Sequence, residues 1–223
     1  TIVTALVLCL VCSVMVSAVA VGLKSKQQEN ARLDLNKNIL VAADKYNPET
    51  ESSSVIAERF DDFEVRLVNL QTGKFATEQE LSAAGITDVN SYNVASAART
   101  PNMSTSLDND IAKIGGKPNF AKVYIERDAA GELNRIVLPI HGAGLWGPIF
   151  GLLTLDKDLN TIKGVNFYQH KETPGLGSRI EEPQWQATWV DKELYNEDGS
   201  MKMAVTKAGT ARSPYNNPEL ITA

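Results

Sequence analysis

The sequence predicts an α+β protein in which one N-terminal transmembrane helix precedes a single antiparallel-sheet domain with flanking helices. Two observations support this fold class. No Asp, Glu, Lys or Arg occurs between Thr1 and Leu23, and all 22 basic and 27 acidic residues follow that run. The second half of the chain holds four consecutive segments that alternate or are bounded like β-strands and are joined by turns. The charged part has a suitable length for one domain with its own core.

The uncharged run, residues 1–23, is the predicted transmembrane helix. At about 1.5 Å per residue it can cross a hydrocarbon core of about 30 Å. A cleaved secretory signal is the alternative, since Ala18-Val19-Ala20 has the small-x-small form of a cleavage site. The run exceeds the usual apolar core of a signal, about 7–15 residues, so we expect a retained anchor. The cations that follow, Lys24, Lys26 and Arg32, would by themselves place the C-terminal side in the cytoplasm.

The cysteine content and the net charge limit the classes of function that the sequence supports. The only two cysteines, Cys9 and Cys12, have C-x-x-C spacing inside the apolar run. That spacing fits a redox or metal site, but cysteine also serves there as a small apolar side chain, which we expect. A net charge of −5 gives no reason to propose nucleic-acid binding.

Residues 24–46 are the predicted juxtamembrane helix, because apolar residues from Leu33 to Ala43 recur at helical spacing. Residues 47–223 then form the predicted domain. It begins with short helices at 52–60 and 77–84, the second capped by Thr77, and a strand at 63–68 between them. Residues 86–118 show no apolar period and are interpreted as a long surface insertion with one helical turn.

Four further strands are expected at 120–127, 133–140, 148–155 and 162–169. Turns at 129–132 and 156–160 connect them into an antiparallel meander. In the first of these strands Val123 and Ile125 alternate with Lys122, Tyr124 and Glu126, which indicates one apolar and one polar face. After the meander we expect a helix at 181–190, with Trp185 and Trp189 on one edge, and a late strand at 201–207.

Two glycine-rich loops, 139–148 and 170–177, contain the only two histidines of the chain. They follow the second and fourth strands of the meander, which run the same way, so both loops can lie at one end of the sheet. Glycine lets backbone amides approach a ligand, and large apolar side chains beside polar ones suit a planar heterocycle. Two tight turns that complete the core would show the same pattern. The candidate contacts in the loops are His141, Gly144, Leu145, Trp146, Glu172, Thr173, Gly175, Leu176 and Gly177.

The chemistry of these loops is otherwise limited. His141 and His170 could ligate a metal, but no motif places a third ligand, so we expect hydrogen-bonded loop histidines. The sequence shows no nucleophile–base pairing and no phosphate-binding P-loop. No catalytic residue and no metal site are therefore assigned.

The run His170-Lys171-Glu172-Thr173-Pro174-Gly175-Leu176-Gly177 resembles the E-T-P-G-L-G signature of the FMN-binding domain family. That family includes the C subunits of sodium-translocating NADH:quinone reductases and the G subunits of Rnf complexes. The H-G-x-G-L-W stretch at 141–146, and the Glu-Pro-x-Trp-x-x-x-Trp stretch at 182–189, are similar to the C subunits specifically. The resemblance extends from the anchor to about Lys207. On the basis of this resemblance, Lys207 is added to the candidate cofactor contacts.

The resemblance implies an electron-transfer flavoprotein subunit of a respiratory sodium-pumping NADH:quinone oxidoreductase, with covalently bound FMN. It implies other membrane subunits and the lipid bilayer as partners, and a single-pass protein of the bacterial inner membrane with a periplasmic domain. The alternatives are the G subunit of an Rnf-type electron-transport complex, or a flavin-free membrane-anchored assembly or binding module. The family attaches FMN to the threonine of an S-G-A-T-x-[S/T] motif, which this sequence lacks. We expect a truncated C-terminus, with that threonine downstream of Ala223.

Overall fold

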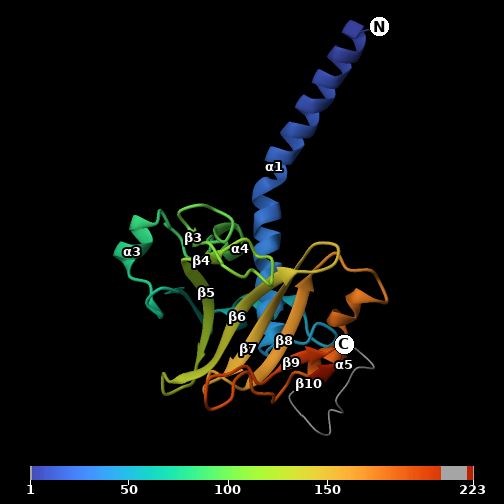
Figure 1. The fold of residues 1–223 in the computed structure, drawn as a ribbon. Coiled ribbons are helices and arrows are strands. Elements are labelled where there is room, and N and C mark those ends of the chain that lie inside the picture. The colour runs from blue at the N-terminus through green and yellow to red at the C-terminus, as the bar shows by residue number, and fades with distance from the viewer. Residues whose placement is uncertain (1, 207–219, 223) are drawn as a thin grey trace.

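The computed structural model describes residues 2–206 and 220–222. One long helix projects from a domain built on an antiparallel sheet, as Figure 1 shows. In chain order the elements are α1 Ile2–Ala42, η1 Ser53–Val55, α2 Ile56–Phe60, β1 Phe63–Asn69, β2 Lys74–Phe75, α3 Glu78–Ala83, α4 Val94–Ala97, β3 Ser104–Thr105, β4 Lys117–Pro118, β5 Phe120–Arg127, β6 Leu133–Ala143, β7 Pro148–Asp156, β8 Ile162–Gln169, η2 Gly177–Glu181, α5 Pro183–Ala187, β9 Ala204–Thr206 and β10 Leu220–Thr222. The α+β fold class is confirmed.

The main sheet has six strands in the order β2-β1-β5-β6-β7-β8, and every neighbouring pair is antiparallel. The predicted meander is therefore present as β5 to β8. Strand β1 extends the meander at its β5 edge. It pairs along the whole length of β1 with β5, from Phe63 opposite Glu126 to Asn69 opposite Phe120. This pairing requires residues 70–119 to return to the same edge of the sheet.

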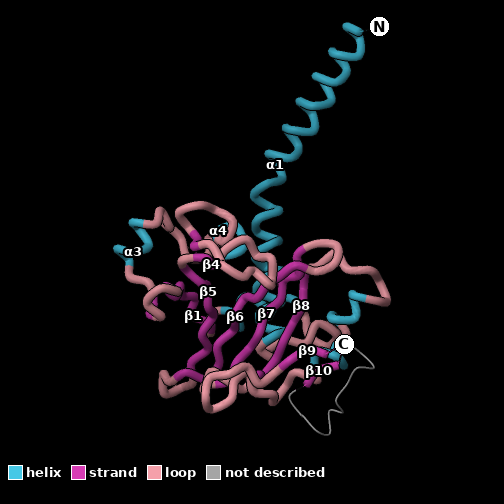
Figure 2. The backbone as a smooth tube through the Cα atoms, viewed as in Figure 1, coloured by secondary structure: helices cyan, strands magenta, loops and turns pink. Residues whose placement is uncertain are grey.

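Both faces of the sheet are covered. The end of α1 packs on one face, where Ile39 and Leu40 meet Tyr124, Val137 and Leu152 in a buried cluster. On the other face a second cluster, consisting of Leu153, Leu155, Ile162, Val165 and Trp189, packs beneath α5 and the segment that follows it. The backbone trace in Figure 2 shows the sheet between these layers.

Helix α1 ends in a Schellman motif, which satisfies two of its last carbonyls. The Lys45 amide donates to the Leu40 carbonyl at 2.7 Å, and the Asp44 amide donates to the Val41 carbonyl at 3.1 Å. Asp44 has φ 55°, the left-handed conformation that this helix end requires.

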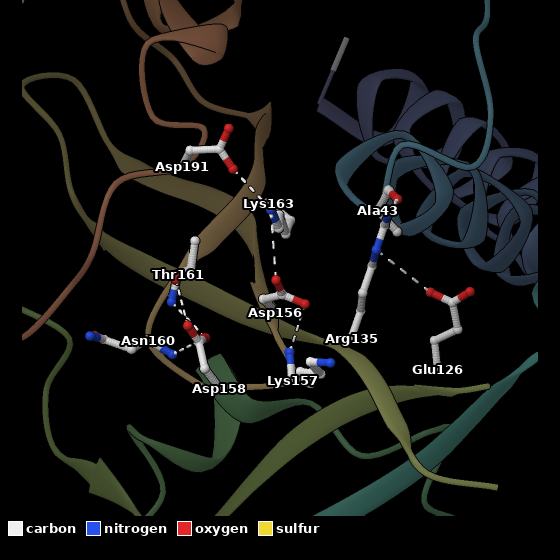
Figure 3. Close-up of polar contacts among 10 residues, drawn as sticks. All are labelled: Ala43, Glu126, Arg135, Asp156, Lys157, Asp158, Asn160, Thr161, Lys163 and Asp191. Carbon is white, nitrogen blue, oxygen red and sulfur yellow. Dashed lines mark hydrogen bonds and ion pairs between the residues drawn. The ribbon is translucent and has the colours of Figure 1, made fainter. Parts of the chain in front are cut away.

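The sheet satisfies the next two carbonyls of α1. The Thr154 hydroxyl on β7 donates to the Ala42 carbonyl at 2.8 Å, and the Arg135 guanidinium on β6 donates to the Ala43 carbonyl; Figure 3 shows Arg135 reaching Ala43. Gly164 on β8 lies against the same turn, and a Cβ there would lie 2.1 Å from the Ala42 oxygen. The helix is thus fixed to the sheet through backbone groups as well as by apolar packing.

The segment after α5 is attached to the edge strand β8. The Asp191 amide donates to the Ile162 carbonyl, and the Ile162 amide donates to the Lys192 carbonyl, both at 2.8 Å. Lys163 Nζ lies 2.9 Å from Asp191 Oδ1 and 3.7 Å from Asp156 Oδ2, as Figure 3 shows. These contacts hold the aromatic cluster on the second face of the sheet.

Several predicted elements differ from the structure. Residues 86–118 are not simply a surface insertion, because they contain α4 and the β3–β4 pair and bury Ile86, Tyr92 and Ala97 in a third core cluster. The predicted helix 181–190 is shorter, as α5 spans only Pro183–Ala187. The late strand is Ala204–Thr206, and it pairs in parallel with β10, which was not predicted. Strand β6 continues to Ala143, three residues beyond the prediction.

Candidate functional site

The connection between β6 and β7 is a tight four-residue hairpin. Ala143 pairs with Pro148, and the Gly144 amide donates to the Gly147 carbonyl at 2.7 Å. Between these residues the hairpin presents Leu145 and Trp146 to solvent, with 81% and 65% of their surface exposed. Two adjacent large apolar side chains held this far out of the core form an exposed apolar patch, which is typical of a ligand or partner surface.

The loop after β8 contains a Pro-Gly turn. The Leu176 amide donates to the Thr173 carbonyl at 3.1 Å, and Gly175 has φ 74°. This matches a type II turn, in which proline suits the second position and glycine supplies the positive φ of the third. The Gly175 amide also donates to Ser178 Oγ at 2.9 Å. The turn leaves Leu176 71% exposed.

Glu172 joins the two loops. Its Oε1 accepts a hydrogen bond from the Trp146 amide at 3.2 Å. The carboxylate lies so close to both glycine-rich backbones that a Cβ on Gly144 would be 2.3 Å from Oε1, and one on Gly177 would be 2.9 Å from Oε2. The glycines at these two positions are therefore required by close approach, and Glu172 sets the spacing between the hairpin and the turn.

His170 orients Glu172 from the other side. Its Nδ1 accepts a hydrogen bond from the Glu172 amide at 3.1 Å, while its Nε2 lies 2.9 Å from Glu181 Oε1. The ring is nearly buried, with 7% of its side chain exposed. His170 thus links the start of the loop to η2, which agrees with the expectation of a hydrogen-bonded loop histidine.

His141 lies in β6, not in a loop as predicted, because β6 stays paired with β7 as far as Ala143. It pairs with Phe150, and the two rings stack with centroids 5.9 Å apart. Its side chain is on the sheet face that α1 covers, and its buried Nε2 has no hydrogen-bond partner among the residues that the structure describes. Burial, and then the nearby Arg99 charge, lower the pKa of His141.

The structure brings most of the predicted site residues together. Gly144, Leu145 and Trp146 lie on the hairpin, and Glu172 contacts the hairpin from the second loop. Within that loop Gly177 lies against Glu172, and Thr173, Gly175 and Leu176 form the adjoining turn. A cavity of about 380 Å³ is lined by the hairpin residues together with Arg99 and Lys113 of the insertion. That all the exposed loop residues share one cleft remains a prediction. Lys207 lies outside the described residues.

Arg99 and Lys113 were missed by sequence reasoning. Both lie in the aperiodic stretch between Ile86 and Pro118, and the only signal in the sequence was the occurrence of three cations there, the third being Lys117. Their approach to the hairpin depends on the amide of Ala143, which donates to the Ala112 carbonyl at 2.7 Å. That contact between distant segments is visible only in the folded chain.

The described loops fit the shape and chemistry of a flavin. Exposed indole and leucine side chains offer flat apolar contacts, the neighbouring Arg99 and Lys113 are cations, and the glycine-rich backbone admits close approach. Among residues 2–206 and 220–222, no group of three His, Cys, Asp or Glu side chains is placed to hold a metal ion.

Comparison with known proteins gives consistent matches. A family model described as FMN-binding domain matches residues 144–216. The chain is 36% identical to the C subunit of the Na(+)-translocating NADH-quinone reductase of Yersinia pestis, over 99% of this chain and 79% of that protein. It is 39% identical to the corresponding protein of Pseudomonas aeruginosa, over 93% of this chain and 77% of that protein. A crystal structure of NqrC from Shewanella oneidensis superposes with a TM-score of 0.72 at 32% identity, covering 86% of this chain and 82% of that one.

Proposed function

The chain belongs to the family of the C subunits of Na(+)-translocating NADH-quinone reductases, and we propose that it carries one covalently bound FMN and transfers electrons within such a sodium-pumping complex. The observation that supports this proposal most directly is the set of exposed apolar side chains Leu145, Trp146 and Leu176. They lie on two loops that Glu172 holds together, within the segment that matches the FMN-binding domain.

These side chains and their neighbours have separate roles in the proposal. Trp146 and Leu176 cover the faces of the ring and exclude water from it, and Glu172 keeps their two loops in register. Arg99 and Lys113 favour added negative charge near the ring, which raises its affinity for electrons. FMN, when bound, accepts and donates electrons one at a time, and the side chains supply the orientation and the electrostatics.

We propose that the attachment point is a threonine that follows Ala223 in the full-length protein. A covalent link keeps the cofactor at a high effective concentration beside its loops, so weak contacts to the ring are sufficient to dock it. This agrees with the open geometry of the loops, in which Leu145 and Trp146 remain 81% and 65% exposed.

The proposed partners are the other, membrane-embedded subunits of the complex, with the domain on the periplasmic side of the inner membrane. One described helix, Ile2–Ala42, is long and apolar enough to cross a bilayer. Its free part projects from the same end of the sheet as the β6–β7 hairpin, as Figure 1 shows. The proposed flavin surface therefore faces the bilayer side of the domain, within reach of centres held in the membrane.

The test is in-gel flavin fluorescence of the full-length protein, expressed in its native host and denatured. We expect ultraviolet-excited fluorescence at the mass of the intact chain, and its loss from that band when the phosphoester link is cleaved. Replacing Leu176 with Ala should keep the link but shift the flavin potential, since the change removes a ring contact and leaves the exposed turn intact. A full-length protein without flavin would refute the electron-transfer role and favour an anchored binding module.

A further inference from the structure

A second and larger cavity lies on the α1 face of the sheet, beneath the insertion. Its volume is about 560 Å³, within the usual range for small-molecule sites. Leu35 of α1, the segment from Tyr92 to Arg99, and residues of four neighbouring strands line it. Three parts of the chain that are remote in sequence thus enclose one space.

The charged side chains that line this cavity are both cations. The carboxylates of Asp88 and Asp34 act on Lys122 and Tyr168 from outside the lining. Arg99 and Lys122 line it, and no Asp or Glu occurs among its described lining residues. Lys122 is only 6% exposed, and its Nζ donates to the Asn90 carbonyl at 2.8 Å. It forms no ion pair with another described residue. A buried ammonium without a carboxylate partner is costly, and burial lowers the pKa of Lys122 to about 8 although Asp88 acts in the opposite direction.

Hydrogen-bonding groups line the same space. The Nε2 atom of His141 is buried and unpartnered within the described part of the chain. The hydroxyl groups of Tyr124 and Tyr168 belong to residues that also line the cavity, where they can hydrogen-bond a ligand. An unpaired buried polar atom such as His141 Nε2 costs about 1–3 kcal/mol, so this arrangement favours a bound polar ligand.

We propose that this cavity binds a small soluble organic anion, a carboxylate or phosphate monoester on an aromatic or aliphatic body. Lys122 and Arg99 hold the charged group, and His141 hydrogen-bonds beside it. Apolar side chains such as Leu35 and Phe150 contact the body of the ligand. The site lies next to the proposed flavin surface, with which it shares Arg99 and His141, and it does not depend on a bound flavin.

The position along α1 favours a soluble anion over a lipid headgroup. Leu35 follows Leu23, the last residue of the uncharged run, by twelve positions. At about 1.5 Å per residue the cavity is up to about 18 Å beyond the hydrocarbon core. The headgroup layer extends only about 5–8 Å on each side, so the cavity opens above it.

Titration calorimetry on the detergent-solubilised full-length protein tests the site, with phenyl phosphate and benzoate as probes. We expect saturable binding of at least one of them with a stoichiometry of one, and none of benzyl alcohol, which has the same ring without the charge. Lys122→Met should weaken binding about 10- to 100-fold, the loss of one charge-assisted hydrogen bond. Lys157→Met, at an exposed turn position, is the matched control and should bind like the unmodified protein.

Three results would overturn the proposal. The first is the absence of saturable heat for both anions at millimolar concentration. The second is equal affinity in the Lys122→Met variant, provided that its thermal unfolding shows a folded protein. The third is tighter binding of short-chain phosphatidic acid than of phenyl phosphate, which would assign the cavity to a lipid headgroup.

Discussion

Lys122 is a buried charged residue that lowers the stability of the folded protein. It lies in the middle of the sheet, on β5, with 6% of its surface exposed and one hydrogen bond to a backbone carbonyl. Its pKa is lowered from 10.5 to about 8, chiefly because burial disfavours the charged form. A residue that costs stability where an apolar one would pack is typical of a binding position.

The pH dependence of stability should show this cost. Because the pKa of Lys122 is lower in the folded than in the unfolded state, the unfolded state binds more protons between about pH 8 and 10.5, and stability from this residue rises with pH across that window. Below pH 8 the full cost of burying the charged Lys122 lowers the free energy of unfolding by about 3 kcal/mol. Other ionisable groups, those of Arg99, His141 and Tyr124, line the same cavity. The contribution of Lys122 is therefore measured as the difference in the free energy of unfolding between the unmodified protein and the Lys122→Met variant.

The comparison is between the unmodified protein and Lys122→Met in urea unfolding at pH 7, 8.5 and 10. The variant should be the more stable protein at pH 7, and its advantage should shrink as the pH rises. Lys157→Met serves as the control for loss of an exposed charge. A constant difference across the three pH values would show that Lys122 is not desolvated in the folded state.

At the scale of the element, the junction between α1 and the sheet is the most specific contact of the fold. Helix ends leave carbonyl groups without partners in the helix, and here Thr154 and Arg135 supply donors to the last turn while Gly164 gives it room. Apolar packing of Ile39 and Leu40 supplies the driving force, and these polar contacts fix the position of the helix.

Replacing Thr154 with Val tests this junction. Val has nearly the shape of Thr, so the change leaves the packing intact and removes the buried hydrogen bond to the Ala42 carbonyl, which should lower the free energy of unfolding by about 1–3 kcal/mol. The matched control is Thr105→Val, an exposed strand position where we expect a change within about 0.5 kcal/mol. Equal effects of the two substitutions in chemical denaturation would contradict this account.

At the scale of the whole molecule, α1 connects the candidate membrane span to the domain without a break. It is one continuous helix from Ile2 to Ala42, and only its last residues are buried. The exposed polar stretch between Leu23 and the domain therefore fixes both the height and the rotation of the loops, since each helical residue adds about 1.5 Å and one hundred degrees.

A kink in that stretch should impair electron transfer, given the proposed function. Asn30→Pro removes a helical hydrogen bond and bends α1 at an exposed position, leaving the domain core untouched. In the assembled complex we expect quinone reduction to fall at least tenfold with an unchanged flavin content, because a small displacement of a reacting centre has large kinetic effects. Asn30→Ala keeps the helix and is the control. Full turnover in the Pro variant would show that α1 need not be rigid.

The fold could be predicted in large part because its signals are local. Strands β5, β7 and β8 begin and end within one residue of the predicted positions, and Thr77 caps α3 in a capping box with Glu80, as its sequence indicates. The insertion could not be predicted in this way, because Tyr92 and Ala97 are buried by Leu67 and Phe120, which belong to other parts of the chain.

The candidate site, like the fold, could be predicted from the sequence only in part. The two glycine-rich loops could be predicted from the sequence. The structure adds that Leu145, Trp146 and Leu176 are exposed and that the loops are in contact through Glu172. The place of His141 could not be predicted, because glycines beside it suggest a loop, whereas its pairing with Phe150 keeps it in a strand.

Local sequence was enough to predict the apolar N-terminal helix, the meander and the two glycine-rich loops, since apolar runs, alternation and turn residues act over a few positions. It also predicted a polar face of β5 at Lys122, Tyr124 and Glu126. The burial of this face could not be predicted in the same way, because α1 and the insertion cover it from distant parts of the chain. The alternation of apolar and polar residues predicts which side chains share one face of the sheet. Which face is covered depends on contacts between distant segments, and no local pattern encodes those contacts.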